Sequence, residues 1–266
     1  MDAAPSSAPY TNINRKMKLI LRTGQLLMEN GADTNRAVRD MIQTSAFFQI
    51  PSAALHLHVV YTTIIINISD GVHAFTSLEK CRKHDANMDV ITAVSRLSAK
   101  ASAKRLTLDE YEAALNHIER LPRRYPAAFS AFGTGIACAA LAIIFGGDLG
   151  AAFCTALASV LGFFVRRRLA FWEVNPYAGI AVAAFAATFA AWLMIPLNLS
   201  ATPYIPMIAG SLCFVPGIPL INAVDDLVND HIIAGLTRAM HTVLIIGAMT
   251  FGIVLTIRLG SVADFT

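Results

Sequence analysis

The sequence predicts an α-helical polytopic membrane protein with about five transmembrane helices, one of them broken, preceded by an N-terminal cytoplasmic α+β domain. Three observations support this class. The chain of 266 residues is 55% hydrophobic and only 15% charged. Of its 39 charged residues, 28 lie before residue 127, so a water-facing part precedes a part almost free of charge. Beyond that boundary, apolar stretches approach the roughly 20 helical residues that cross a hydrocarbon core.

The first part opens with a predicted flexible tail, residues 1–12, which lacks the features of a signal peptide. Residues 13–125 are expected to form the cytoplasmic domain. Apolar residues at three- and four-residue steps predict a helix over 13–30 that ends at Gly31. A second helix is expected to begin at Asp33 or Thr34, since either side chain can cap it.

The rest of this domain is predicted to contain strands and two further helices. In residues 55–80, apolar side chains recur with a period of two and many residues are β-branched. Asp70-Gly71 is a typical hairpin turn, so two or three strands are expected. Helices follow near 87–104 and 107–121. Thr107 and Glu110 form a capping box at the start of the second.

Residues 126–266 are expected to form the transmembrane bundle. Five charge-free spans leave too little polar sequence to coat the core of a soluble protein. Arginines before the first span and at 166–168 after the second place the N-terminal domain on the cytoplasmic side of the membrane. The spans are predicted near 127–147, 149–165, 177–197, 204–224 and 239–257.

The fourth span carries its own helix breakers. Pro216 and Pro219 each remove a backbone hydrogen bond, so the break is expected to face protein or a wet cavity instead of lipid. Pro219 suits the first turn of a new helix, whose free N–H groups could hold a substrate carboxylate. The candidate substrate-binding residues are therefore Pro216, Gly217, Pro219 and Asn222.

Polar residues follow the break at helical spacing. Asn222, Asp225 or Asp226, and Asn229 could line a path to the cytosol, and acidic groups in such places mark proton relays. Asp225, Asp226 and Asn229 are thus candidates for coupling or gating. The alternative is an ordinary proline kink followed by solvated or capping aspartates. No arginine lies inside the predicted spans, which favours an amino acid over a dicarboxylate as the substrate.

The sequence predicts no catalytic site, no metal site and no cofactor, so the protein is not expected to be an enzyme. It contains no Gly-rich phosphate loop and no Ser/His/Asp arrangement, and its four cysteines form no CxxC pair. The net charge is only +3, with basic groups clustered at predicted membrane borders, so nucleic acid is not an expected partner. The lipid bilayer is.

Three motifs carry a resemblance to a known family. ENGADTNRAVRDM, RKHDANMDVITAVSRLS and VPGIPLINAVDDLVNDHIIAGLTR occur in this order, and over about residues 13–260 the chain resembles the threonine/serine exporter family. It is most similar to the split form, in which a large subunit works with a small membrane subunit of the YjjB type. The family motif falls on Pro216, Gly217, Pro219, Asn222 and Asp226, with Gly235 downstream, and on Gly31, Arg36, Asp85 and Asn87.

The resemblance implies a function. Family members export threonine and serine, and the split pair is associated with succinate. The expected protein is a subunit of a secondary exporter of small carboxylate metabolites, with protons as the coupling ion. A homo-oligomer of the heteromer is one expected assembly. Arg36, Asp85 and Asn87 are candidates for a function of the cytoplasmic domain. The alternative is a membrane-anchored sensor or scaffold whose cytoplasmic domain binds a ligand or protein.

Overall fold

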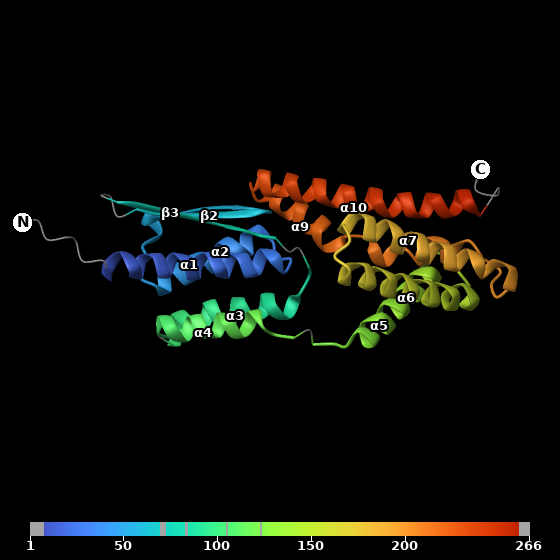
Figure 1. Cartoon of the computed structure of the whole chain (residues 1–266), viewed down its shortest axis with the longest axis horizontal. Helices are drawn as coiled ribbons and strands as arrows, with labels where there is room; N and C mark the ends of the chain where they lie inside the picture. Colours follow the sequence, from blue (N-terminus) through green and yellow to red (C-terminus); the bar gives the residue numbers. More distant parts are fainter. Residues whose placement is uncertain (1–7, 70–72, 83–84, 105, 123, 261–266) are drawn as a thin grey trace, which may run out of the picture. The chain divides into compact units, whose positions relative to one another are not determined.

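The computed structural model describes residues 8–69, 73–82, 85–104, 106–122 and 124–260 (Figure 1). The chain folds as two compact units. The first unit comprises residues 1–122 and 218–240, and the second unit comprises residues 123–217 and 241–266. The sequence placed a single boundary near residue 125, whereas the first unit also includes residues 218–240, which contain the second half of the broken span.

Two helices form the centre of the first unit. Helix α1 (Ala8–Glu29) begins within the predicted tail, whose residues 1–7 lie outside the described residues. It ends before Gly31, which has a φ of +91° that a residue with a side chain rarely adopts. Helix α2 (Thr34–Phe47) then begins as expected, with the Asp33 side chain accepting a hydrogen bond from the backbone N–H of Arg36.

A three-stranded antiparallel sheet follows, in the order β1 (Leu55–Val60), β2 (Thr63–Ser69) and β3 (Ala74–Lys80), after a short 3-10 turn η1 (Ser52–Ala54). The register pairs Leu57 with Ile66 and Ile66 with Ser77. Alternate residues of β2 are buried, as the period of two predicts. The predicted turn at Asp70-Gly71 lies outside the described residues.

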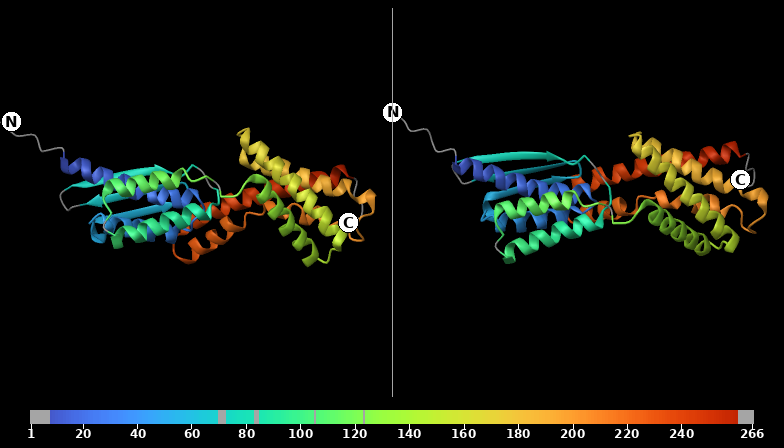
Figure 2. Two further views of the ribbon diagram at one scale, coloured as in Figure 1. Left: turned by 90° about the horizontal axis from the view of Figure 1, so that it is seen from below. Right: turned by 60° about the horizontal axis from the view of Figure 1, so that its bottom comes forward.

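Helices α3 (Met88–Lys104) and α4 (Leu108–Glu119) complete three layers, in which the sheet covers one face of α1 and α2, and α3 and α4 cover the other (Figures 1 and 2). The predicted capping box of Thr107 and Glu110 opens α4. Between the layers, the buried hydroxyl of Tyr111 lies 3.0 Å from the hydroxyls of both Thr23 and Thr44, so this polar group is satisfied inside the core.

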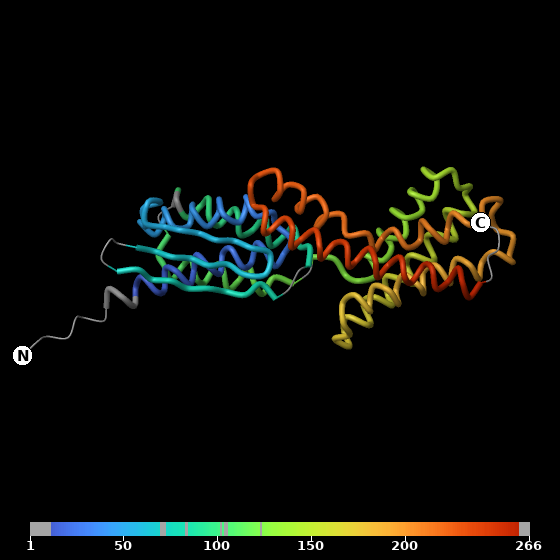
Figure 3. The backbone as a smooth tube through the Cα atoms, turned by 90° about the horizontal axis from the view of Figure 1, so that it is seen from above, coloured from blue at the N-terminus to red at the C-terminus, as the bar shows by residue number. Residues whose placement is uncertain are grey.

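The first unit is completed by helix α9 (Gly217–Val228) and the first turns of helix α10 (Ile232–Leu259), which form a tight helical hairpin (Figure 3). The sequence assigned residues 225–238 to a loop before the last span. In the structure α10 begins at Ile232, so Arg238 lies within this helix. A charge limits the membrane-spanning stretch but does not stop a helix, which explains the difference.

The second unit is a helical bundle. Helices α5 (Ala127–Ile144), α6 (Leu149–Phe171) and α7 (Pro176–Leu193) are followed by short helical turns and by the rest of α10. Small residues let these helices approach closely: a Cβ on Gly162 would lie only 2.9 Å from that of Ala187. Asp148 caps α6 and accepts hydrogen bonds from Ser200 and Ala201. The short turns are η2 (Ile195–Leu197), α8 (Ile205–Ala209) and η3 (Leu212–Phe214).

Four helical segments in the described residues are long and apolar enough to cross a membrane, and a bent pair brings the total to five if it counts as one span. The bent pair is the predicted fourth span: Ile205–Phe214 and Gly217–Val228 meet at an angle of 58°. This architecture supports a multi-pass membrane protein. Helix α6 continues beyond the predicted end of the second span, through the arginines at 166–168. The four single segments are Ala127–Ile144, Leu149–Phe171, Pro176–Leu197 and Ile232–Leu259.

Candidate functional site

The loop between α1 and α2, residues 30–33, is the place where the three sequence motifs meet. On one side it is held by the segment before α3. The backbone N–H of Asp85 donates to the carbonyl of Glu29 at 3.1 Å, and that of Asn87 donates to the carbonyl of Asn30 at 3.0 Å. A Cβ on Gly31 would lie 3.4 Å from the Cα of Ala86. Close approach therefore adds to the positive φ as a reason for glycine.

Two residues of the third motif, both on α9, contact the same loop. Asn222 donates from its side-chain amide to the carbonyl of Gly31 at 2.8 Å. Asp226, one helical turn later, accepts through Oδ1 from the backbone N–H of Thr34 at 2.9 Å. Residues four apart on a helix share a face, so α9 presents both side chains to the loop. The Asp226 carboxylate thereby sits at the N-terminus of α2, where the helix dipole favours a negative charge.

Arg238 of α10 completes the site. Its Nε lies 3.2 Å from Asp226 Oδ2, and both side chains are almost completely buried. Arg238 also donates from Nη2 to the carbonyl of Ala32 at 3.2 Å, and its guanidinium carbon lies 4.9 Å from the centroid of the Tyr61 ring. A buried charge requires such pairing because desolvation otherwise costs several kcal/mol, on the order of 3–5 for a broken pair.

The turn between α9 and α10 adds two contacts. The backbone N–H of His231 donates to the carbonyl of Asp226 at 2.8 Å, and its ring Nε2 lies 2.9 Å from Asn35 Oδ1. Residues 29–35 thus form hydrogen bonds with three separate parts of the first unit: the segment before α3, helix α9 and the start of α10. This arrangement fixes the position of a buried carboxylate and a buried guanidinium.

A cavity of about 220 Å³ opens beside this loop. The Asn222 side chain lines it, so the cavity and the ion pair lie one helical turn apart on α9. Arg36 supplies a positive charge to the cavity wall, and its Nε is 3.9 Å from Asp33 Oδ2. The lining consists of Gly31, Ala32, Asp33, Arg36, Met88, Ile91, Ile218, Ile221 and Asn222.

The other two predicted polar residues, Asp225 in α9 and Asn229 directly after it, do not contact the loop. Asp225 is half-buried and Asn229 is exposed, and the Asn229 amide donates to Asp225 Oδ1 at 3.2 Å. The polar stripe expected along α9 therefore divides into two faces: Asn222 and Asp226 contact the loop, whereas Asp225 and Asn229 contact each other. This follows from a rotation of about 100° per residue, which turns adjacent aspartates in different directions.

The proline break is present. Pro219 lies in the first turn of α9, as its fixed φ predicts. Pro216 is buried and Gly217 is exposed, and the N–H of Gly217 donates to the carbonyl of Val215 at 2.9 Å. Pro216 and Gly217 belong to the second unit, whereas Pro219 belongs to the first.

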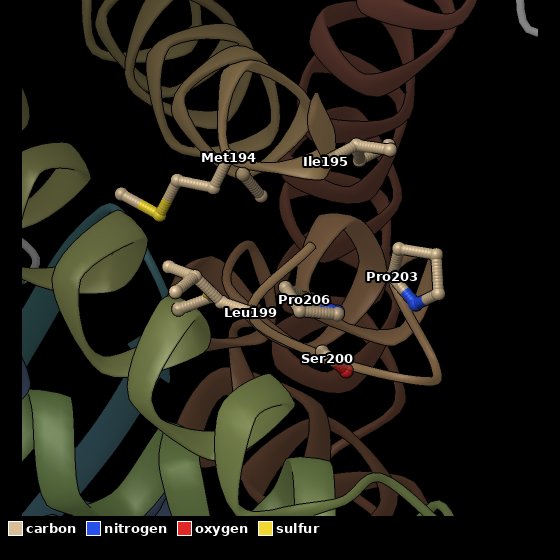
Figure 4. A pocket seen from close by; sticks show the side chains of 8 residues that line it. Met194, Ile195, Leu199, Ser200, Pro203 and Pro206 are labelled. Carbon is tan, nitrogen blue, oxygen red and sulfur yellow. The ribbon is translucent and has the colours of Figure 1, made fainter. Parts of the chain in front are cut away.

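A pocket in the second unit is not a substrate site. Figure 4 shows the side chains around it, which come mainly from residues 194–206 and are mostly apolar. Its volume is only about 10 Å³, which is about the space that one water molecule requires. A four-carbon metabolite is much larger than this pocket.

Sequence reasoning missed Arg238, Thr34, Tyr61 and His231. Arg238 offered one signal, because it is the single charge in the apolar stretch from Ile232 to Ile257. Its partner is twelve residues earlier and on another helix, so spacing along one helix could not identify the pair. Thr34 contributes a backbone N–H, which any residue type except proline supplies.

Comparisons with known proteins identify the family of the chain. A family model described as "Putative threonine/serine exporter" (ThrE) matches residues 18–260. The chain is 30% identical to "Probable succinate transporter subunit YjjP" of Escherichia coli K12, over 91% of this chain and 93% of the relative. A protein of the same description from Klebsiella aerogenes is also 30% identical, with the same coverage. No solved structure matches. The chain therefore belongs to the threonine/serine exporter family.

Proposed function

We propose that this protein is a subunit of a secondary exporter in the bacterial inner membrane, which moves small carboxylate metabolites out of the cell without chemical modification. Family membership, the candidate membrane spans and the transporter names of both relatives support this function. The substrate is succinate, as in the relatives' names, or threonine and serine, as in the family's name. The N-terminal domain is on the cytoplasmic side, as the arginines beside the spans predict.

The buried Asp226–Arg238 pair carries the proposal. Asp226 is a motif residue that is fully buried and lies at the loop where all three motifs meet. A carboxylate in such surroundings is suited to exchange a proton as its pairing changes, and we assign it the coupling of export to the proton gradient. We assign the substrate carboxylate to the break at Pro216, Gly217 and Pro219, because the N–H groups in the first turn of the following helix have no intrahelical acceptor. Asp225 and Asn229 are assigned to gating at the other face of α9.

A partner is part of the proposal. Both relatives are named as subunits of a transporter. The resemblance to the split form implies that the second subunit is a small membrane protein of the YjjB type. The resulting heteromer could itself assemble into oligomers.

Efflux from proteoliposomes tests the function. Vesicles preloaded with labelled succinate, threonine or serine are prepared with this protein alone, with the partner alone and with both. We expect efflux of at least one metabolite, dependent on a pH gradient, only when both subunits are present. Failure of all three metabolites to leave the vesicles would refute the exporter and favour a membrane-anchored sensor or scaffold.

A further inference from the structure

The cavity beside the α1–α2 loop has the size and lining of a small-metabolite site. Its volume of about 220 Å³ is below the roughly 300–1,000 Å³ of sites for drug-sized ligands. Met88, Ile91 and Ile218 supply apolar walls that suit a short carbon chain. The polar groups are confined to Asp33, Arg36 and Asn222 and the loop backbone.

Arg36 is the only cation among the described residues that line this cavity. Its guanidinium makes no hydrogen bond within the described part of the chain, and 41% of its side chain is exposed. The nearest carboxylate oxygen, Asp33 Oδ2, is 3.9 Å away, which is too long for a hydrogen bond. The fork of donors on a guanidinium therefore remains available, and its geometry matches the two oxygens of a carboxylate.

The neighbouring polar groups define the second half of the ligand. Asp33 Oδ1 is already engaged, because it accepts from the backbone N–H of Arg36 at 2.7 Å and caps α2. Asn222 uses its amide N–H to bind the Gly31 carbonyl, while its amide oxygen accepts no hydrogen bond from the described residues. That oxygen can accept from a hydroxyl, an ammonium or a protonated acid on the ligand.

We propose that this cavity binds a small aliphatic carboxylate, with Arg36 holding the carboxylate and Asn222 contacting the second functional group. The proposal rests on the proposed function, since it identifies the ligand with the exported metabolite on its entry side. The bound ligand would lie one turn of α9 from Asp226. Occupancy of the cavity is thereby linked, through Asn222 and the Gly31 carbonyl, to the loop that holds the buried ion pair.

Titration calorimetry on the purified full chain in detergent tests the site. The ligands are succinate, threonine and serine, and the controls are butane-1,4-diol and threoninol, which lack a carboxylate. We expect binding of a carboxylate ligand and of neither control. Arg36→Gln should weaken binding by about tenfold or more, because charge-assisted hydrogen bonds are lost. Arg39→Gln, on the same helix but outside the cavity, is the matched control and should stay within about twofold of the wild type.

The negative charge of Asp33 should affect the affinity for succinate and the affinity for threonine or serine in opposite directions. Asp33→Asn retains a capping side chain but removes the negative charge. It should strengthen succinate binding, by relief of repulsion, and weaken binding of threonine or serine, whose ammonium it attracts. If Asp33→Asn leaves the affinity for all three ligands unchanged, the ligand does not bind between Arg36 and Asp33 as proposed.

Two results would overturn the site: a wild-type chain that binds none of the carboxylates, or an Arg36→Gln chain that binds them as tightly as the wild type. The failure of the proposed function can be distinguished from the failure of this site. If carboxylates bind through Arg36 but the complete heteromer exports none of them, the cavity stands as a ligand site and the exporter does not. If export proceeds while Arg36→Gln leaves binding unchanged, the exporter stands and this site does not.

Discussion

A double-mutant cycle on Asp226 and Arg238 is the sharpest test of the buried site. Arg238→Met keeps an apolar stem of similar length but removes the guanidinium. Asp226→Asn keeps an acceptor for the Thr34 N–H but removes the negative charge. Each single variant leaves one buried charge without its partner, since Arg238 Nε and Asp226 Oδ2 are 3.2 Å apart and both side chains are almost completely buried. The double variant leaves no buried charge.

The structure sets the expected magnitudes. Each single variant should lower the free energy of unfolding of the first unit by about 3–5 kcal/mol, the usual cost of breaking a buried pair. The double variant also loses the hydrogen bond from Arg238 to the Ala32 carbonyl, about 1 kcal/mol. It further loses the cation over the Tyr61 ring, about 2 kcal/mol when desolvated. These two losses sum to about 3 kcal/mol, and removing both charges also removes the cost of burying them, so the total loss should be at most about 3 kcal/mol and smaller than that of either single variant.

Cys81 provides the assay. This thiol is buried in the first unit, so its modification reports opening of that unit. Purified protein in detergent is equilibrated at increasing urea, pulsed briefly with a thiol reagent and digested, and mass spectrometry quantifies the modified Cys81 peptide. The midpoint and slope give the free energy of opening. If the losses of the two single variants add up in the double variant, the two charges are not coupled and the described pair is wrong.

Three further predictions concern the first unit. Gly31→Ala should lower the free energy of unfolding by about 1–2 kcal/mol in the same assay, because φ is +91° and Ala86 lies close. Hydrogen bonds from Thr107 hold the pKa of Glu110 below its ordinary value, so its stabilisation is present above the ordinary carboxyl pKa and is lost as pH falls through the lower folded value. Glu110→Gln should flatten this acid dependence. Burial raises the pKa of Cys81 to about 12, so alkylation at pH 8 should be slow, and stability should fall as pH rises above the ordinary thiol value of about 9.

A specific result would contradict each of these three predictions. A Gly31→Ala chain with the urea midpoint and slope of the wild type would discount the special backbone at Gly31. Identical urea midpoints for wild type and Glu110→Gln across pH 3–7 would remove the capping carboxylate from the acid response. Rapid native-state alkylation of Cys81 at pH 8 would show that the thiol is accessible.

Local signals in the sequence predicted most of the fold. The period of two over residues 55–80, the Asp33 cap and the capping box of Thr107 each specify a short segment by its own residues, and the structure confirms them. The ends of apolar helices were predicted less well. Helix α6 continues through its arginines and α10 starts before Arg238, because hydropathy reports which residues tolerate lipid while helix length depends on backbone bonding and tertiary partners.

The candidate site was predicted only in part. The motifs identified Asn222 and Asp226 on α9 and Gly31, Asp85 and Asn87 in the first unit, all of which meet at one loop. Their roles could not be predicted, since Asp85 and Asn87 bind the loop through backbone N–H groups that carry no residue signature. The sequence also suggested that the spans offer no arginine. Arg238 lies within α10, and its pairing with Asp226 depends on the tertiary hairpin.

The most direct test of the central claim is efflux driven by a pH gradient, measured for wild type, Asp226→Asn and Asp226→Asn/Arg238→Met at equal membrane insertion with the partner present. The double variant separates the loss of the carboxylate from the loss of folding, because it should be more stable than Asp226→Asn alone and still lacks the carboxylate. We predict that both variants lose gradient-driven efflux. Wild-type efflux with wild-type pH dependence in the double variant would contradict the coupling role of Asp226.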